Sequence, residues 1–125
     1  MVEHGYRQLR IFNRTKDTLL AWRAEIADSA GARLIGLLGR RNLESGGGLW
    51  LVPTNSIHTV GMRFPIDVLM LSRHAIVVGL RKSVRPFSIV WPNFRANSIL
   101  ELPPSTISKT QTEAGDRIEI AEIEI

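Results

Sequence analysis

The second half of the chain is built from short apolar runs joined by short connections, and this pattern restricts the fold more than any other feature. The length and spacing of the runs predict β-strands. Parallel strands need crossovers of about a dozen residues or more, so neighbouring runs are expected to pair antiparallel. The predicted strands cover residues 49–52, 57–64, 66–72, 75–80, 98–102 and 117–125, and the longest connection, 81–97, is expected to be an irregular excursion.

The first 40 residues predict a hairpin followed by a helix. Residues 6–13 and 18–26 alternate as strands do, with a polar turn from Asn13 to Asp17 between them. One amphipathic helix is predicted near residues 29–40, because Leu34, Leu37 and Leu38 recur at helical spacing behind a capping residue. The expected fold is therefore mainly β (α+β), a compact antiparallel barrel-like or sandwich sheet with one helix.

The last quarter of the chain carries three turn and strand signals. Pro103-Pro104-Ser105 is expected to begin a short helix or a turn, and Gly115-Asp116 predicts a turn into the last strand. The apolar phase of that strand changes near Ala121, which predicts a bulge or a change of neighbouring strand there.

Length and composition limit the function classes. A chain of 125 residues with 44% hydrophobic residues is the size of one domain, so we expect residues 1–125 to share a single core. The absence of cysteine excludes disulfides, thiolate catalysis and cysteine-ligated metals. The three histidines do not have metal-ligand spacing, so we expect no metal and no cofactor. The N-terminus lacks the apolar region of a signal peptide and no apolar run is long enough to cross a membrane, so the expected location is cytoplasmic.

The charges are distributed unevenly. The net charge is +4, five acids lie between residues 113 and 124, and Asp67 is the only acid among the cations of the middle segment. Either this basic middle binds an anion or a nucleic acid, or its cations pair with the acidic last strand. We favour the second interpretation because the cations come singly and lack the interleaved aromatic residues of single-strand binders. Nucleic acid is therefore not the expected partner.

The segment from Ser56 to Asp67 contains the densest set of chemically capable side chains. His58 can act as a general base, Arg63 can bind an oxyanion, and Asp67 can orient either of them. Thr59 adds a hydroxyl, and Glu101 faces either the same polar patch as Asp67 or water. We take these five residues as candidate ligand-binding residues and assign none of them a catalytic role.

Strand alternation favours structural roles for the same residues. In a straight strand His58 shares the core-facing side with Met62 and Phe64, and the alternation is expected to reset at Pro65. A buried His58 needs a backbone or hydroxyl partner. A buried Asp67 needs hydrogen bonds from Arg63 or from backbone amides. Trp22, Trp50 and Trp91 are interpreted as packing residues rather than as a binding cage.

Several motifs together resemble a known family. The stretch from Arg33 to Arg40, the sequence SIHTVGMRFPIDVLML, then ILELP and finally AGDRIEI occur in the order found in domain-of-unknown-function family 192. The resemblance implies a compact, mostly β domain with barrel-like character and a helix, and no established activity. The most recurrent positions of the family correspond to Arg33, Gly36, Met62, Pro65, Asp67, Glu101, Gly115 and Asp116. The chain departs from many members at Ser72–Ala75 and at Pro103–Ser105.

Three hypotheses for the function follow. The first is a non-enzymatic binding module that recognises a small polar ligand or a protein segment around His58–Asp67, because nothing in the sequence activates a nucleophile. The second is a small hydrolase or isomerase with His58 as base and Asp67 as orienting group. The third is an anion or nucleic-acid binder acting through the basic middle. A homodimer through an edge strand is compatible with all three, and a membrane partner is not expected.

Overall fold

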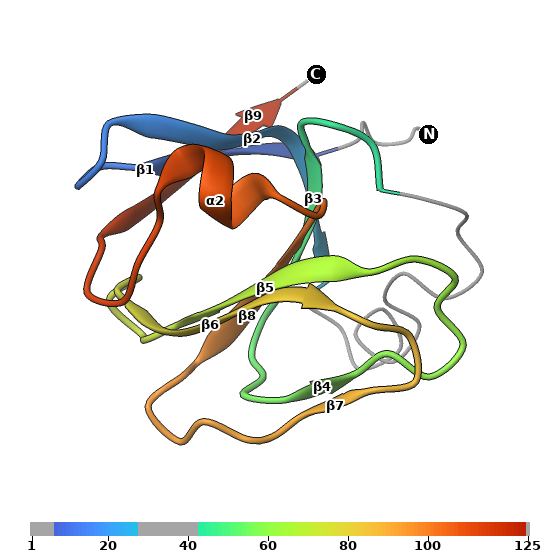
Figure 1. Ribbon diagram of the computed structural model, residues 1–125. Helices are drawn as coiled ribbons and strands as arrows, with labels where there is room; N and C mark the ends of the chain where they lie inside the picture. Colours follow the sequence, from blue (N-terminus) through green and yellow to red (C-terminus); the bar gives the residue numbers. More distant parts are fainter. Residues whose placement is uncertain (1–6, 28–42, 125) are drawn as a thin grey trace.

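The computed structural model describes residues 7–27 and 43–124 (Figure 1). The helix predicted near residues 29–40 lies outside the described residues. The described elements are β1 (Arg7–Asn13), β2 (Thr18–Ala27), β3 (Gly47–Leu51), β4 (Ile57–His58), β5 (Ile66–Leu71), β6 (Val77–Val84), β7 (Ile89–Val90), β8 (Ser98–Leu102), α2 (Thr106–Thr110) and β9 (Ile118–Glu124). None of the helices within these ranges is long and apolar enough to span a membrane.

Seven of the strands form one large sheet in the order β6-β5-β8-β3-β2-β1-β9. The mainly β fold and the opening β1–β2 hairpin are confirmed, but the sheet is mixed, because β2 and β3 pair in parallel. The residues between Ala27 and Gly47 provide the long connection that a parallel pair needs. Of the two expected forms, barrel-like or sandwich, the structure has the second, because the sheet is not closed. The two edge strands approach each other only at the isolated bridge between Ile76 and Arg117, so the fold is sandwich-like.

In place of the single core expected from the sequence, two apolar cores lie on the two faces of this curved sheet. Strand β5 is buried along its whole length because it contributes to both cores. Leu69 and Leu71 enter the first core together with residues of β1, β2 and α2. Val68 and Met70 point the other way and enter the second core. This burial on both faces explains why residues 66–71 are nearly all apolar and do not alternate with polar residues.

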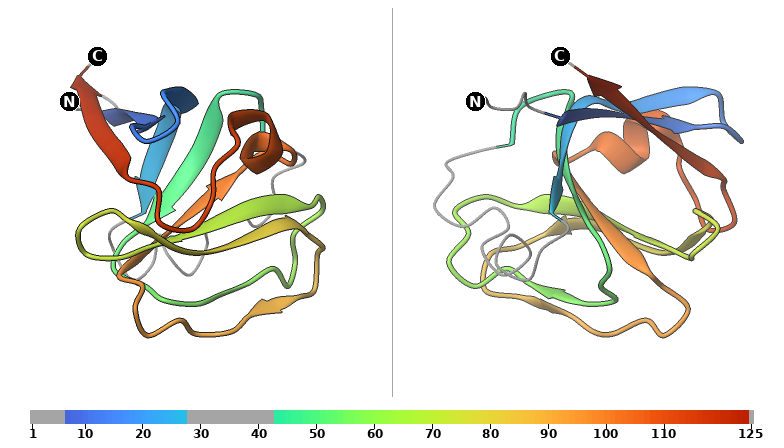
Figure 2. Two further views of the ribbon diagram at one scale, coloured as in Figure 1. Left: turned by 60° about the vertical axis from the view of Figure 1, so that its left-hand side comes forward. Right: turned by 180° about the vertical axis from the view of Figure 1, so that it is seen from behind.

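Strands β4 and β7 form a separate two-stranded sheet below the β5–β6 hairpin (Figure 2). Backbone hydrogen bonds continue the pairing on both sides, from Thr54 N–H to Asn97 O (3.0 Å) and from Thr59 N–H to Ser88 O (2.9 Å). We call residues 54–62 and 85–97 the arm. Its inner side chains, Ile57 and Val90, belong to the second core.

The predicted strand 57–64 is wrong beyond its first two residues. After His58 the chain makes a turn in which Met62 N–H donates to Thr59 O (3.1 Å) and Gly61 has a φ of +88°. The alternation therefore resets at this turn and not at Pro65. As a result Met62 enters the second core, while His58 is exposed instead of facing the core as expected.

The end of the chain follows its sequence signals with one exception. Helix α2 begins just after Pro103-Pro104-Ser105, and Gly115 takes a φ of +94° in the turn before β9. The bulge expected near Ala121 is not there, because β9 pairs with β1 in continuous register. The irregularities lie instead in the pairing of β1 with β2, around Ile11.

Candidate functional site

Asp67 is completely buried and its carboxylate is held by backbone amides. Oδ1 accepts from Ser83 N–H of β6 (2.9 Å) and Oδ2 accepts from Ile107 N–H of α2 (2.8 Å). Of the two partners considered for a buried Asp67, the structure shows the backbone amides. The carboxylate thus connects the edge strand β6 and helix α2 to the central strand β5.

Glu101 does not share a polar patch with Asp67. Residues that lie opposite each other in a ladder point to the same face, and Glu101 lies opposite Val68 and Leu49 of the second core. Asp67 lies opposite Leu102 of the first core. The two carboxylates are therefore on opposite faces of the sheet, and Glu101 is buried there rather than exposed to water.

Thr59 is buried and holds the turn that precedes β7. Its hydroxyl donates to Arg85 O (2.7 Å) and accepts from Ser88 N–H (2.7 Å). Its backbone carbonyl also accepts from Phe87 N–H (3.0 Å). Thr59 thus fixes Phe87, whose φ of +60° is unusual for a residue with a Cβ.

We expect Thr59→Val to lower the free energy of unfolding by about 1–3 kcal/mol, because the isosteric methyl leaves Ser88 N–H without its side-chain acceptor. The measurement is urea denaturation followed by tryptophan fluorescence. Thr59→Ser keeps the hydroxyl and is the matched control, with a smaller expected loss. A Thr59→Val variant as stable as the wild type would show that the hydroxyl contributes nothing here.

His58 and Arg63 are both exposed and do not meet Asp67. His58 Nδ1 accepts from Val60 N–H (3.3 Å) in the turn that follows it, and the Asp67 oxygens accept from Ser83 and Ile107. Of the five candidate residues, Asp67 and Glu101 are therefore buried on opposite faces of the sheet, and Thr59 is buried in the arm. His58 and Arg63 are exposed. The arrangement brings no base together with an orienting carboxylate.

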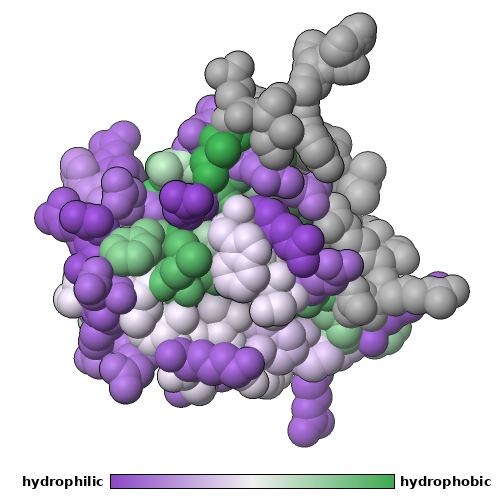
Figure 3. All heavy atoms as spheres, turned by 90° about the horizontal axis from the view of Figure 1, so that it is seen from above, coloured by the Kyte–Doolittle hydropathy of each residue, from purple (hydrophilic) through white to green (hydrophobic). Residues whose placement is uncertain are grey.

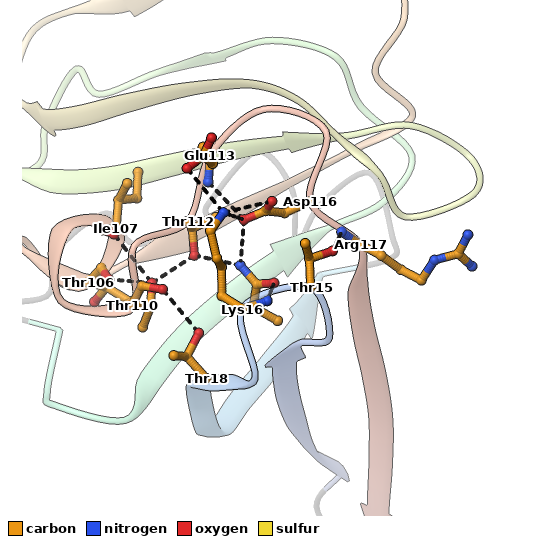
Figure 4. Close-up of polar contacts among 11 residues, drawn as sticks. Thr15, Lys16, Thr18, Thr106, Ile107, Thr110, Thr112, Glu113, Asp116 and Arg117 are labelled. Atoms are coloured by element: carbon orange, nitrogen blue, oxygen red, sulfur yellow. Dashed lines mark hydrogen bonds and ion pairs between the residues drawn. The ribbon is translucent and has the colours of Figure 1, made fainter.

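A second polar cluster, which ties the β1–β2 turn to the turn before β9, was not singled out from the sequence (Figure 4). Asp116 is buried and accepts from Asn13 Nδ2 (2.9 Å), Lys16 Nζ (2.9 Å) and Glu113 N–H (3.0 Å). Asn13 also donates to Thr112 Oγ1 (3.0 Å). The cluster is closed on itself and structural.

The pKa values of this cluster shift in opposite directions. Burial raises the pKa of Asp116, but the hydrogen bonds from Asn13, Lys16 and Glu113 together outweigh it and bring the pKa below the ordinary 3.8. The hydrogen bond to Asp116 raises the pKa of Lys16 above the ordinary 10.5, against a smaller opposing effect of desolvation. Both groups are therefore charged at neutral pH.

Residues 45–100 expose cationic side chains and no carboxylate, and we call these residues the cationic stretch. Asp67 is the only acid in it and is fully buried. Its six cations, Arg63, Arg73, Arg81, Lys82, Arg85 and Arg95, are all exposed. The expected pairing of these cations with the acidic last strand is not formed among the described residues. The acids near the C-terminus pair instead with the first hairpin, as in Arg14–Glu119 (3.4 Å) and Lys16–Glu113 (3.2 Å).

Large apolar side chains are exposed on the arm, among these cations. Phe87, Ile89 and Trp91 alternate along the chain on its outer side, and Phe87 and Trp91 are 73% and 72% exposed. Phe94 is 89% exposed, and Val60 is also uncovered. Isolated exposed apolar residues are ordinary, but several on one short segment indicate an interaction surface.

The sequence contained the signal for this surface. Arg85 and Arg95 flank a segment with three aromatic residues, Phe87, Trp91 and Phe94, and no cation lies between these aromatic residues. The interpretation of Trp91 as a packing residue was wrong, because its side chain is 72% exposed.

Comparisons with known proteins place the chain in an uncharacterised group. Residues 11–120 match the family model DUF192, described as an uncharacterized ACR. A protein of unknown function from Novosphingobium aromaticivorans has a similar structure, with a TM-score of 0.76, 16% identity, and 90% of this chain and 83% of that chain covered. A proposed transcription regulator from Sinorhizobium meliloti has a TM-score of 0.74 and 20% identity, with 95% and 96% covered. No curated protein matches the chain.

Proposed function

Because the chain belongs to domain-of-unknown-function family 192, described as an uncharacterized ACR, we propose a function from its own surface. The protein is a non-enzymatic binding module that holds single-stranded nucleic acid on the outer side of the arm. The observation that carries the proposal is the set of exposed aromatic side chains among exposed cations, in a stretch with no exposed carboxylate.

Electrostatics favour a polyanionic partner. Residues 45–100 contribute six exposed cations and no exposed acid, so the stretch itself supplies no carboxylate that could neutralise them. Among the described residues none of the six forms an ion pair. Cations of this kind contact phosphates and release counterions from a nucleic acid on binding.

The aromatic side chains favour a single strand over a duplex. Bases of a single strand can stack on exposed aromatic rings, whereas the faces of paired bases are covered in a duplex. Phe87 is fixed for this role, because the Thr59 hydroxyl and carbonyl hold the turn that carries it. A strained residue that surrounding hydrogen bonds hold in place is typical of a functional site. A fixed ring also loses less entropy on stacking than a mobile one.

The His58–Asp67 segment fits a supporting role better than a binding role. The Asp67 carboxylate already accepts two backbone amides and is completely buried. Thr59 acts on the arm from within, because its hydroxyl bonds to the turn before β7. His58 and Arg63 are exposed near this turn and are available to a strand on the arm.

The test is fluorescence anisotropy with a labelled 12-nucleotide oligothymidine at a series of NaCl concentrations. With about four phosphates contacted, the logarithm of the association constant is expected to fall with log salt at a slope of about −3. Trp91→Ala is expected to weaken binding about five- to a hundredfold, the loss of one stacked base. Arg85→Gln is expected to reduce the magnitude of the slope by about 1.

Arg10→Gln is the matched control, because Arg10 is an exposed arginine on β1, outside the cationic stretch. It is expected to bind the oligonucleotide like the wild type. The proposal is wrong if the oligonucleotide does not bind at about 50 mM salt, or if Trp91→Ala and Arg85→Gln bind as Arg10→Gln does. Vesicles of phosphatidylglycerol and phosphatidylcholine are measured in parallel. Trp91-dependent binding to the vesicles without binding to the oligonucleotide would assign the arm to a lipid surface instead.

A further inference from the structure

The outer face of strands β2, β1 and β9 carries a second apolar surface, away from the arm. Figure 3 looks onto this face and shows hydrophobic side chains gathered between hydrophilic ones. The surface contains an open hollow of about 450 Å³. Its lining residues are Arg10, Phe12, Arg14, Leu19, Trp22, Glu119 and Ala121. The solvent face of an antiparallel sheet is ordinarily polar, so this composition is unusual.

Side-chain size and backbone geometry create the hollow. Ala121 lies directly opposite Arg10 in the β1–β9 ladder, and its small side chain leaves space between larger neighbours. Trp22, which is 47% exposed, borders this space, with its indole directly over Gly46. Gly46 has a φ of +82°, and a Cβ at this position would overlap the indole ring. The backbone N–H groups of Trp22 and Arg23 both donate to Gly46 O (3.0 Å each), which holds the loop beneath the ring.

Of the two arginines that line the hollow, only Arg10 forms no ion pair with a described residue. Arg14 contacts Glu119 (3.4 Å) and lies over the Phe12 ring, 5.5 Å from its centroid. Arg10 is exposed and forms no ion pair with a described residue. The hollow therefore combines an apolar floor, a half-exposed indole, the Arg14–Glu119 pair and the Arg10 guanidinium, which has no ion-pair partner among the described residues.

We propose that this hollow binds a small planar aromatic carboxylate, with its ring against Trp22 and Ala121 and its carboxylate on Arg10. The volume lies in the range of small-molecule sites, about 300–1,000 Å³. Aromatic ligands stack on indole rings, and a guanidinium matches a carboxylate in a bidentate hydrogen-bonded pair. The site is independent of the arm and of its proposed function.

The probe is 2-naphthoate, titrated into the isotope-labelled full chain and followed by two-dimensional NMR. Shifts are expected at the Trp22 indole N–H and the Ala121 methyl group. The neutral analogue 2-naphthalenemethanol is expected to bind about tenfold more weakly, because it lacks the charge that Arg10 meets. Ala121→Leu fills the hollow from an exposed position and is expected to abolish the shifts, while Arg10→Gln is expected to weaken naphthoate binding to that of the neutral analogue.

Trp91→Ala is the control, because it alters the arm and leaves the hollow intact. It is expected to bind naphthoate like the wild type, and the dispersion of each variant's spectrum shows that it is folded. The proposal is overturned if naphthoate causes no shifts at millimolar concentration, if the shifts map to the arm and disappear in Trp91→Ala, or if folded Ala121→Leu binds as well as the wild type. Equal affinity for the neutral analogue would overturn the assignment of the carboxylate to Arg10.

Discussion

Asp67→Ala is expected to lower the free energy of unfolding by about 3–5 kcal/mol, as typical for the loss of a buried charged acceptor. The substitution leaves two backbone amides, those of Ser83 and Ile107, without their acceptor inside the protein. It also opens space in a strand that is buried throughout. The measurement is urea denaturation followed by circular dichroism and by tryptophan fluorescence.

Two further variants make the Asp67 prediction specific. Asp67→Asn keeps the size but places an NH₂ group against one of the two amides, so it is also expected to destabilise the protein, by about 2–4 kcal/mol. Arg63→Ala is the matched control and is expected to change the stability by less than about 0.5 kcal/mol, because Arg63 is exposed. If Arg63→Ala cost as much as Asp67→Ala, the buried carboxylate would depend on Arg63 and not on the two amides.

Asp116 is expected to make the stability of the protein depend on pH. Its pKa is lower in the folded protein than the ordinary 3.8, because the hydrogen bonds from Asn13, Lys16 and Glu113 outweigh the effect of burial. A carboxyl group with a lowered folded pKa contributes stability that is fully present above the unfolded pKa and is lost as pH falls through the folded pKa. The contribution of Asp116 is therefore complete at neutral pH and disappears below pH 3.8.

Asp116→Asn tests this dependence by urea denaturation at a series of pH values. At pH 7 the variant is expected to be less stable than the wild type by about 2–4 kcal/mol, since three donors lose a charged acceptor. The difference is expected to shrink at acid pH, where the wild-type carboxylate is protonated. A difference that stays constant down to about pH 2 would show that the charge of Asp116 contributes nothing to it.

Lys16 affects the stability at alkaline pH. Its raised pKa gives stability that is present below pH 10.5 and is lost as the pH rises through the folded pKa.

Alternation in the first hairpin and short apolar runs in the middle of the chain made most strands predictable. The first hairpin, the central strand at Ile66–Leu71 and the strand Ser98–Leu102 lie where the sequence placed them, within a residue or two. These segments are buried on one or both faces, so the side-chain pattern directly records the packing. The parallel pairing of β2 and β3 was not predictable in this way, because alternation does not report which strand is the neighbour.

The candidate site was less predictable, because it depends on turns. A one-residue difference in phase moves a strand side chain to the other face. The Thr59–Met62 turn changes the phase, so His58 is exposed while Thr59 is buried. Glu101 and Asp67 lie on opposite faces because the β5–β8 register places them one step apart. Neither fact follows from composition or spacing.

The motif Met62-Arg63-Phe64-Pro65-Ile66-Asp67, which carries the strongest resemblance to the family, has a structural explanation. Met62, Phe64 and Ile66 are buried in the second core, while Asp67 reaches the first core and helix α2. The motif thus crosses from one core to the other within six residues. Its specificity reflects the requirements of packing on two sides and does not by itself indicate catalysis.

The carboxylate of Asp67 also disfavours incorrect alignments of β5 with its neighbouring strands. Five of the six residues of β5 are apolar, and an apolar strand buried on both faces could slip along its neighbours with little loss of hydrophobic contact. Asp67 is the single residue of the strand that does not tolerate a slip, because only one alignment brings its oxygens to the amides of Ser83 and Ile107. Every misaligned form buries an unsatisfied charge. The residue therefore selects one native structure among compact competitors.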